Sequence, residues 1–99
     1  MATSMNKEAN KLLVNTSDQL AFYCNDGRVL HNLRDLADAL RMMSDDTYRY
    51  HANDAKNDFA AWVRDVFGDA RLSNELLWSS SRKQAAEKVA HKVASVTGK

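Results

Sequence analysis

The sequence predicts a mainly α fold, a compact bundle of four to five short helices with a small N-terminal β-hairpin. Three observations predict this fold class. Apolar residues recur at helical spacing in several consecutive segments, which is typical of amphipathic helices. The 99 residues include no Pro and three Gly, so few positions interrupt a helix. An Asn-Asp-Gly turn signal stands between β-prone residues ahead of these segments.

A chain of 99 residues has the size of one domain and can bury about two-thirds of its unfolded surface. We expect residues 1–18 to form a polar, partly ordered arm and residues 19–96 to form a single helical domain. Within this domain the expected elements are a hairpin at about 20–30 and helices at about 33–43, 45–53, 57–67, 70–78 and 82–96.

The hairpin is expected in the stretch LAFYCNDGRVL, where apolar and aromatic residues flank Asn25, Asp26 and Gly27. Asp-Gly favours a tight turn because Gly accepts a positive φ and Asp tolerates one. Isolated hairpins are marginal in water, so this hairpin must pack against the helices.

Each of the first two helices has an expected cap. Asn32 caps the first helix, and Ser44 caps the second, whose first turn carries Asp45 and Asp46 at the positive end of the helix. The apolar stripe of the first helix is Leu33, Leu36, Ala37, Leu40 and Met43. On the second helix, the side chains expected to point at the third helix are Tyr48, His51 and Ala55.

The third helix carries the densest apolar periodicity, and we expect the bundle to be centred on it. Asn57 can cap its start, and Gly68 can end it in the left-handed conformation. Its wide apolar face is formed by Phe59, Trp62, Val63, Val66 and Phe67.

The last two helices follow the same rules. Asp69 caps the fourth helix, which Trp78 closes, and Ser81 with Gln84 forms a capping box for the fifth. The inward residues of the fourth helix are expected to be Leu72, Leu76 and Leu77. The narrow apolar stripe of the fifth is Ala85, Val89, Val93 and Val96.

Overall composition narrows the protein class. Lys plus Arg number 14 and Asp plus Glu 13. The net charge is therefore close to zero, and the overall electrostatic field favours neither a polyanionic nor a polycationic partner. The single cysteine fits a reducing compartment and excludes an intrachain disulfide. The N-terminus has no apolar run of signal-peptide or membrane-spanning length. We therefore expect a soluble, cytoplasmic protein with no membrane partner.

Charge is nevertheless segregated, because the segment 82–99 has Glu87 as its one acidic residue. Its basic residues are candidate nucleic-acid contacts that could meet phosphates as point charges. The alternative is a solvated basic helix face, and the aromatic residues are expected in the core, which leaves no platform for stacking bases. The candidate contacts are Arg82, Lys83, Lys88, Lys92 and Lys99.

A cysteine–histidine–carboxylate catalytic site could in principle be assembled from one set of residues. The thiol would be Cys24, the base His51 and the orienting carboxylate Asp58. Spacing alone does not bring these residues together. A lone Cys beside apolar residues is more often a small buried hydrophobe, and His51 is better interpreted as a packed residue. We expect no catalytic residue.

The oxygen ligands between residues 45 and 69 could suggest a metal site, but they lack the alternating spacing, central Gly and closing Glu of a calcium loop. Helix caps and first turns explain most of them. We expect no metal and no cofactor. The ligands considered are Asp45, Asp46, Asn53, Asp54, Asn57, Asp58, Asp65 and Asp69.

Residues 20–78 resemble a small prokaryotic domain family of unknown function, found in archaea and bacteria. The resemblance implies a shared fold and no established activity. The residues that carry it are Phe22, Asp26-Gly27, Leu30, Leu33, Leu36, Leu40, Tyr50-His51, Asn57-Asp58-Phe59-Ala60, Trp62-Val63, Val66, Gly68-Asp69 and Leu72.

Three functions are therefore considered. The first is a non-enzymatic interaction module that binds a protein partner or itself as a homo-oligomer. The second is a nucleic-acid-associated protein that uses the basic C-terminal helix. The third is a small cysteine and histidine enzyme.

Overall fold

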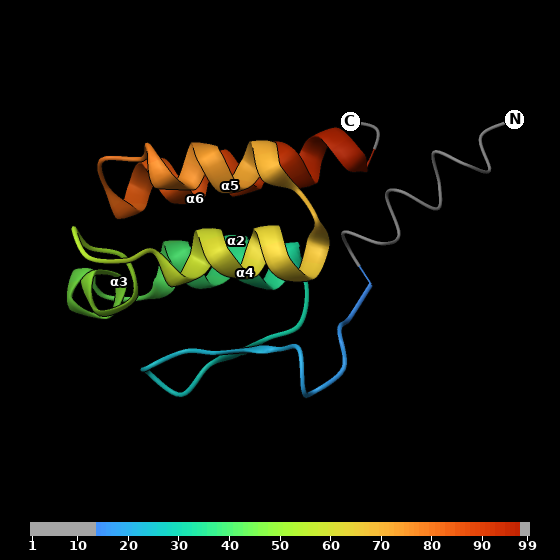
Figure 1. The fold of residues 1–99 in the computed structure, drawn as a ribbon, viewed down its shortest axis with the longest axis horizontal. Coiled ribbons are helices and arrows are strands. Elements are labelled where there is room, and N and C mark those ends of the chain that lie inside the picture. Colours follow the sequence, from blue (N-terminus) through green and yellow to red (C-terminus); the bar gives the residue numbers. More distant parts are fainter. Residues whose placement is uncertain (1–13, 98–99) are drawn as a thin grey trace, which may run out of the picture.

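Four of the five helices within residues 14–97 form two layers, and the hairpin covers one of these layers (Figure 1). The computed structural model describes residues 14–97. In Figure 1, α2 and α4 form one layer, α5 and α6 form the other, and α3 closes one end. The predicted mainly α bundle with an N-terminal hairpin is confirmed. The elements are β1 (Phe22–Tyr23), β2 (Val29–Leu30), α2 (Leu33–Met42), α3 (Asp45–His51), α4 (Asp58–Phe67), α5 (Ala70–Leu77) and α6 (Arg82–Val96).

Every described helix begins at a polar residue whose side chain accepts a hydrogen bond from a backbone N–H three residues later. All five predicted caps are confirmed: Asn32, Ser44, Asn57, Asp69 and Ser81. Gly68 ends α4 at φ 68°, in the left-handed conformation. The capping box differs in one contact, because Gln84 Oε1 accepts from the N–H of Ser80 at 2.7 Å and not from that of Ser81.

The core has an aliphatic and an aromatic part. The aliphatic part lies where α2 packs against α6, and it includes the fully buried Leu36, Leu40 and Val89. The α4 helix packs mainly against α5 and carries the aromatic part. The sequence predicted that the bundle is centred on the helix that is α4 in the structure. In the structure, α4 shares the core with the α2–α6 pair.

Aromatic rings join the hairpin to α4. Phe22 of β1 stacks on Phe59 with ring centroids 5.0 Å apart, and Trp62 meets the edge of Phe67 at 5.0 Å. The Trp62 Nε1–H donates to the carbonyl of Leu20 at 2.7 Å. The hairpin is thus held by apolar packing and by long-range hydrogen bonds, among them the one from Trp62, as its marginal intrinsic stability requires.

The hairpin turn is one residue longer than the tight turn predicted. Phe22 pairs with Leu30 and Tyr23 with Val29. The Gly27 N–H donates to the Cys24 carbonyl at 3.0 Å, and Gly27 has φ 97°. This pattern is a three-residue loop closed by a bulge at a left-handed Gly. Asp26 does not adopt a positive φ, since no non-Gly residue among 14–97 does.

Five side chains of the described residues lie on the surface although the sequence placed them in the core. The α3 helix ends at His51, two residues before the predicted end, which leaves Ala55 in an exposed loop. Leu77 is half exposed at the end of α5. Tyr23, Tyr50 and Trp78 are also exposed, so the expectation that the aromatic residues are committed to the core is wrong for these three.

Part of the predicted N-terminal arm, residues 1–13, lies outside the described residues. The part at 14–18 runs beside the segment that joins β2 to α2. Thr16 N–H donates to the His31 carbonyl at 2.7 Å, and Asn32 Nδ2–H donates to Asn15 Oδ1 at 2.7 Å. Among residues 14–97, no helix has the length and apolar character needed to cross a membrane.

Candidate functional site

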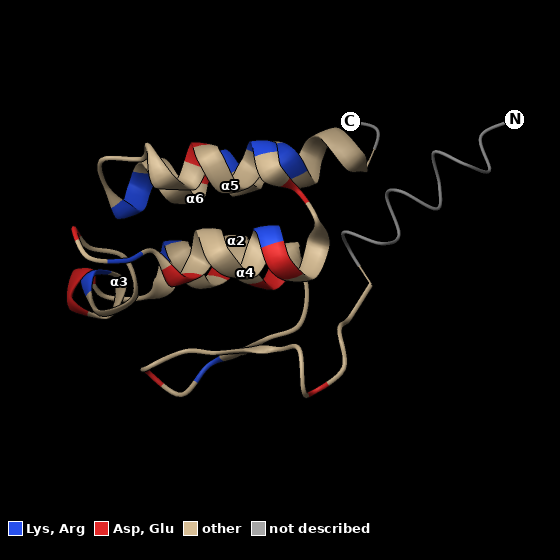
Figure 2. Ribbon diagram, in the orientation of Figure 1, with Lys and Arg blue, Asp and Glu red and all other residues tan. Residues whose placement is uncertain are grey.

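The predicted basic residues of α6 do not form one continuous surface. Figure 2 shows Lys and Arg at separate places along α5 and α6. Lys83 and Lys88 are exposed and five positions apart, which places them roughly 140° apart around a helix axis at about 100° per residue. Neither makes an ion pair within residues 14–97. Lys99 lies outside the described residues.

Arg82 contacts other helices. Its Nε–H donates to Asp45 Oδ1 at 2.8 Å, and its Nη1–H donates to the carbonyls of Leu40 at 2.8 Å and Arg41 at 3.1 Å. It thereby satisfies carbonyls at the end of α2 and holds the start of α6 against α3. The hydrogen bond from Arg82 keeps the pKa of Asp45 below its usual value. A nucleic-acid contact by Arg82 stays a prediction.

Lys92 also faces a carboxylate. Its Nζ lies 3.3 Å from Asp69 Oδ2, a buried oxygen that accepts no hydrogen bond from any described residue. The ammonium therefore compensates this oxygen by charge more than by a well-directed hydrogen bond. Two of the four described basic candidates, Arg82 and Lys92, are thus engaged within the protein.

The residues considered for catalysis are brought only partly together. His51 Nδ1 lies 3.0 Å from Asp58 Oδ2, which Lys56 Nζ also contacts at 2.9 Å. The other ring nitrogen, Nε2, accepts the N–H of Asn25 at 2.9 Å. Because a backbone N–H can only donate, His51 is neutral here, with its proton on Nδ1 and shared with Asp58.

This arrangement connects the hairpin loop to α3 and α4. Burial raises the pKa of the buried Cys24 thiol, which favours the less nucleophilic protonated form. His51 Nε2 is already occupied by Asn25, so it is not directed at the thiol. The His51–Asp58 pair therefore acts as a structural connection in this geometry, and a catalytic role stays a prediction.

The ion pair of Asp58 should make stability depend on pH. Burial acts to raise the pKa of Asp58, but hydrogen bonds from His51 and Lys56 outweigh it and keep the pKa below its usual 3.8. A carboxylate whose pKa is lower in the folded state stabilises the fold above its unfolded pKa, and this contribution is lost as pH falls through the folded value. We expect the free energy of unfolding of Asp58→Asn to fall less than that of the parent between about pH 5 and pH 3.

Urea unfolding at a series of pH values measures this difference. Asp54→Asn is the matched control, because Asp54 is exposed and makes no ion pair within residues 14–97. The control should follow the parent curve. A parallel acid dependence for Asp58→Asn and the parent would show that the pair does not stabilise the fold.

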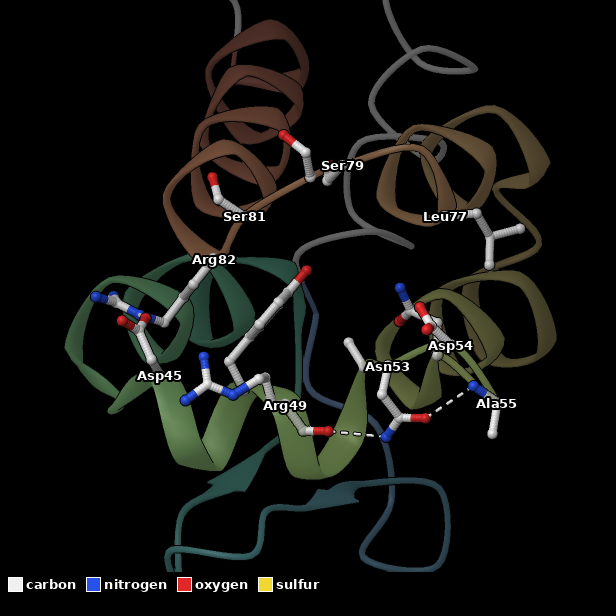
Figure 3. A pocket seen from close by; sticks show the side chains of 13 residues that line it. Asp45, Arg49, Asn53, Asp54, Ala55, Leu77, Ser79, Ser81 and Arg82 are labelled. Atoms are coloured by element: carbon white, nitrogen blue, oxygen red, sulfur yellow. Dashed lines mark hydrogen bonds and ion pairs between the residues drawn. The ribbon is translucent and has the colours of Figure 1, made fainter.

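A hollow lies at the end of the molecule closed by α3 (Figure 3). This end hollow, about 810 Å³ in volume, is lined by residues of α3, by the loop 52–57 and by the corner 77–82 between α5 and α6. Hydrogen bonds fix its walls. Asn53 Nδ2–H donates to the Arg49 carbonyl at 2.8 Å, and Asn57 Nδ2–H donates to the Leu76 carbonyl at 3.3 Å.

A second hollow, about 460 Å³ in volume, lies on the other side of the same corner. Trp78 lines it and is 86% exposed, the largest fraction among the exposed large apolar side chains of residues 14–97. We call it the Trp78 hollow. Leu77 faces the end hollow and Trp78 the Trp78 hollow, so one turn of chain contributes an apolar side chain to each.

The sequence contained a signal for the exposure of Trp78. At about 100° per residue, Leu76 stands roughly 40° from the buried Leu72, whereas Trp78 stands roughly 120° from it on the opposite side from Leu76. A helical wheel of α5 that places Leu72 and Leu76 toward the core therefore places Trp78 on the side that faces away from the core. Among residues 14–97, no three His, Cys, Asp or Glu side chains are grouped where they could hold a metal ion.

Comparisons of the chain with protein-family models, with curated proteins and with solved structures found no match. The resemblance of residues 20–78 to a prokaryotic domain family therefore stays a prediction.

Proposed function

We propose that this protein is a non-enzymatic interaction module that binds a segment of a protein partner in the end hollow. The observation that carries the proposal is a hollow of about 810 Å³ with a half-exposed Leu77 on its wall. A protein-binding surface needs an apolar contact surrounded by groups that can form hydrogen bonds, and the end hollow supplies both.

The polar groups of the end hollow suit a polypeptide backbone. Ser79, Ser80 and Ser81 bring hydroxyl groups from the corner, and Asn53 brings an amide from the opposite wall (Figure 3). Two arginines and two aspartates of the lining balance in charge, which favours a neutral segment over a strongly charged one. These four residues are Asp45, Arg49, Asp54 and Arg82.

The walls are formed in advance of binding. Ala55 N–H donates to Asn53 Oδ1 at 2.9 Å, and Asn53 N–H donates to the Lys56 carbonyl at 2.8 Å. Arg82 fixes the opposite wall through its three contacts. A surface that is already ordered loses little conformational entropy when a partner binds. The single cysteine suits a reducing compartment, and we propose that the protein acts in the cytoplasm.

Photo-cross-linking from position 77 tests the proposal. With benzoylphenylalanine in place of Leu77, irradiation of the producing cells should give discrete heavier species that contain one partner protein or a second copy of the chain. The matched position is Glu87, which is exposed on α6 and outside the end hollow. Similar species from both positions would remove the end hollow as the binding surface.

The recovered partner is then titrated against purified variants. Leu77→Glu should bind about tenfold or more weakly, since it places a charge in an apolar contact. Its melting temperature should stay close to that of the parent because Leu77 is 51% exposed. Unchanged affinity of Leu77→Glu would contradict the proposal.

A further inference from the structure

Trp78 is held in the solvent by an ordered corner of the chain. Its N–H donates to the Asn74 carbonyl at 3.0 Å, and the next residue, Ser79, donates from N to the Leu76 carbonyl at 3.2 Å and from Oγ to the Glu75 carbonyl at 2.8 Å. Trp is normally among the more buried residues, and its large ring dominates binding surfaces when it is exposed. A fixed backbone beneath an exposed indole therefore presents the ring in a defined place.

The groups around the ring are cations and amides. Arg71 and Asn74 lie on α5 and Trp78 caps its end, at three- and four-residue spacing, and Gln84 and Lys88 lie four residues apart on α6. The Arg71 side chain is 90% exposed, and its Nε lies 4.0 Å from Glu75 Oε2. The Trp78 hollow thus holds two cations and one carboxylate, Glu75.

We propose that the Trp78 hollow binds single-stranded nucleic acid, with one base stacked on the indole and adjacent phosphates near Arg71 and Lys88. Base stacking on an exposed aromatic ring, together with basic side chains that follow the backbone, is the usual way in which proteins hold single strands. Asn74 and Gln84 can donate from their amides to base or sugar oxygens. Gln84 keeps this capacity because its contact with Ser80 uses only Oε1.

The composition of the lining favours nucleic acid over a protein partner. Among the described residues, Trp78 is the one apolar side chain that lines the Trp78 hollow. The centre of a protein interface is depleted of Lys and Glu, and the lining holds one of each, Lys88 and Glu75. A stacked base needs only the face of the ring, and its phosphates are compensated by the two cations. Leu77, the nearest large aliphatic residue in sequence, lines the other hollow.

A single strand fits better than a duplex. The ring can stack only on a base that has left a paired helix, and a single strand supplies such bases without the cost of opening a duplex. Each phosphate contact on a single strand contributes about −0.7 to the log–log dependence of affinity on salt. Two contacts therefore give a slope of about −1.4.

The test titrates fluorescein-labelled oligothymidylate and oligouridylate, each 12 nucleotides long, with the full chain, and follows fluorescence anisotropy at two salt concentrations. The parent should bind both oligonucleotides, more tightly than a duplex of the same length. Trp78→Ala should weaken binding about tenfold or more. The double variant Arg71→Gln and Lys88→Gln should bind more weakly and bring the salt slope close to zero.

The matched control is the double variant Arg34→Gln and Lys83→Gln. Both residues are exposed, make no ion pair within residues 14–97 and lie outside the Trp78 hollow. This control removes the same charge and should bind like the parent. All the substituted side chains other than Trp78 are polar, and all are exposed, so thermal melts of the three variants should match that of the parent.

Several results would overturn the proposal. One is the absence of any anisotropy change when the parent is added at low salt. Another is an affinity of Trp78→Ala equal to that of the parent. The others are a loss of affinity in the Arg34 and Lys83 control as large as that in the Arg71 and Lys88 variant, and tighter binding of the parent to the duplex than to the single strands. Self-association of the parent that Trp78→Ala abolishes, without binding to either oligonucleotide, would instead assign the Trp78 hollow to a protein contact.

Discussion

Trp62→Ala is expected to lower the free energy of unfolding by about 3–5 kcal/mol, a large part of the total stability of a small domain. The Trp62 side chain is 8% exposed and contacts the rings of Phe22 and Phe67. Its removal leaves a cavity between α4 and the hairpin, and it leaves the Leu20 carbonyl without its donor. Urea and thermal unfolding followed by circular dichroism measure the effect.

Trp62→Phe separates the contribution of ring packing from that of the hydrogen bond to the Leu20 carbonyl. It keeps an aromatic ring in the cluster but removes the Nε1–H that bonds to Leu20. We expect a loss of about 1–3 kcal/mol for this variant. A melting temperature of Trp62→Ala equal to that of the parent would contradict the position of Trp62 in the core.

His51→Ala is expected to lower the free energy of unfolding by about 2–4 kcal/mol. His51 is 5% exposed, and its ring packs against Phe22 and Phe59. Its two nitrogens also serve two other segments, since Nε2 accepts from Asn25 and Nδ1 meets Asp58. The substitution removes both the ring contacts and the two polar contacts.

His51→Leu is the control for volume. It fills most of the space of the ring but leaves the Asn25 N–H without its acceptor, so it should recover part of the stability and not all of it. Amide hydrogen exchange at Asn25 should become faster in both variants. Parent-like exchange at Asn25 in both would show that His51 does not hold the hairpin loop.

Local features of the fold could be predicted because their contacts are local. A helix cap needs only an oxygen three residues before an N–H, and this is why Asn57 and Ser81 were identified from sequence. The end of α3 was missed because Asn53 bonds to the Arg49 carbonyl and turns the chain away. A polar residue near a helix end can continue the helix or cap it, and periodicity does not distinguish the two.

Contacts between distant segments could not be predicted. Arg82 donates to the Leu40 carbonyl across 42 positions, and no pattern in the sequence favours this contact over a guanidinium in solvent. The pairing of His51 with Asp58 likewise depends on how the loop between α3 and α4 closes. Both hollows are formed by helix ends that come together only in the folded chain, so the candidate sites emerged from the structure.

The packing of α2 against α6 has a consequence for the order of folding during synthesis. The apolar face of α2 is made early, but the helix that covers most of it is the last of the described elements to leave the ribosome. Contacts between segments far apart in sequence form late and slow the folding reaction. Until α6 arrives, Leu36 and Leu40 stay uncovered in the nascent chain, and this interval is when the protein is most exposed to aggregation and to chaperones.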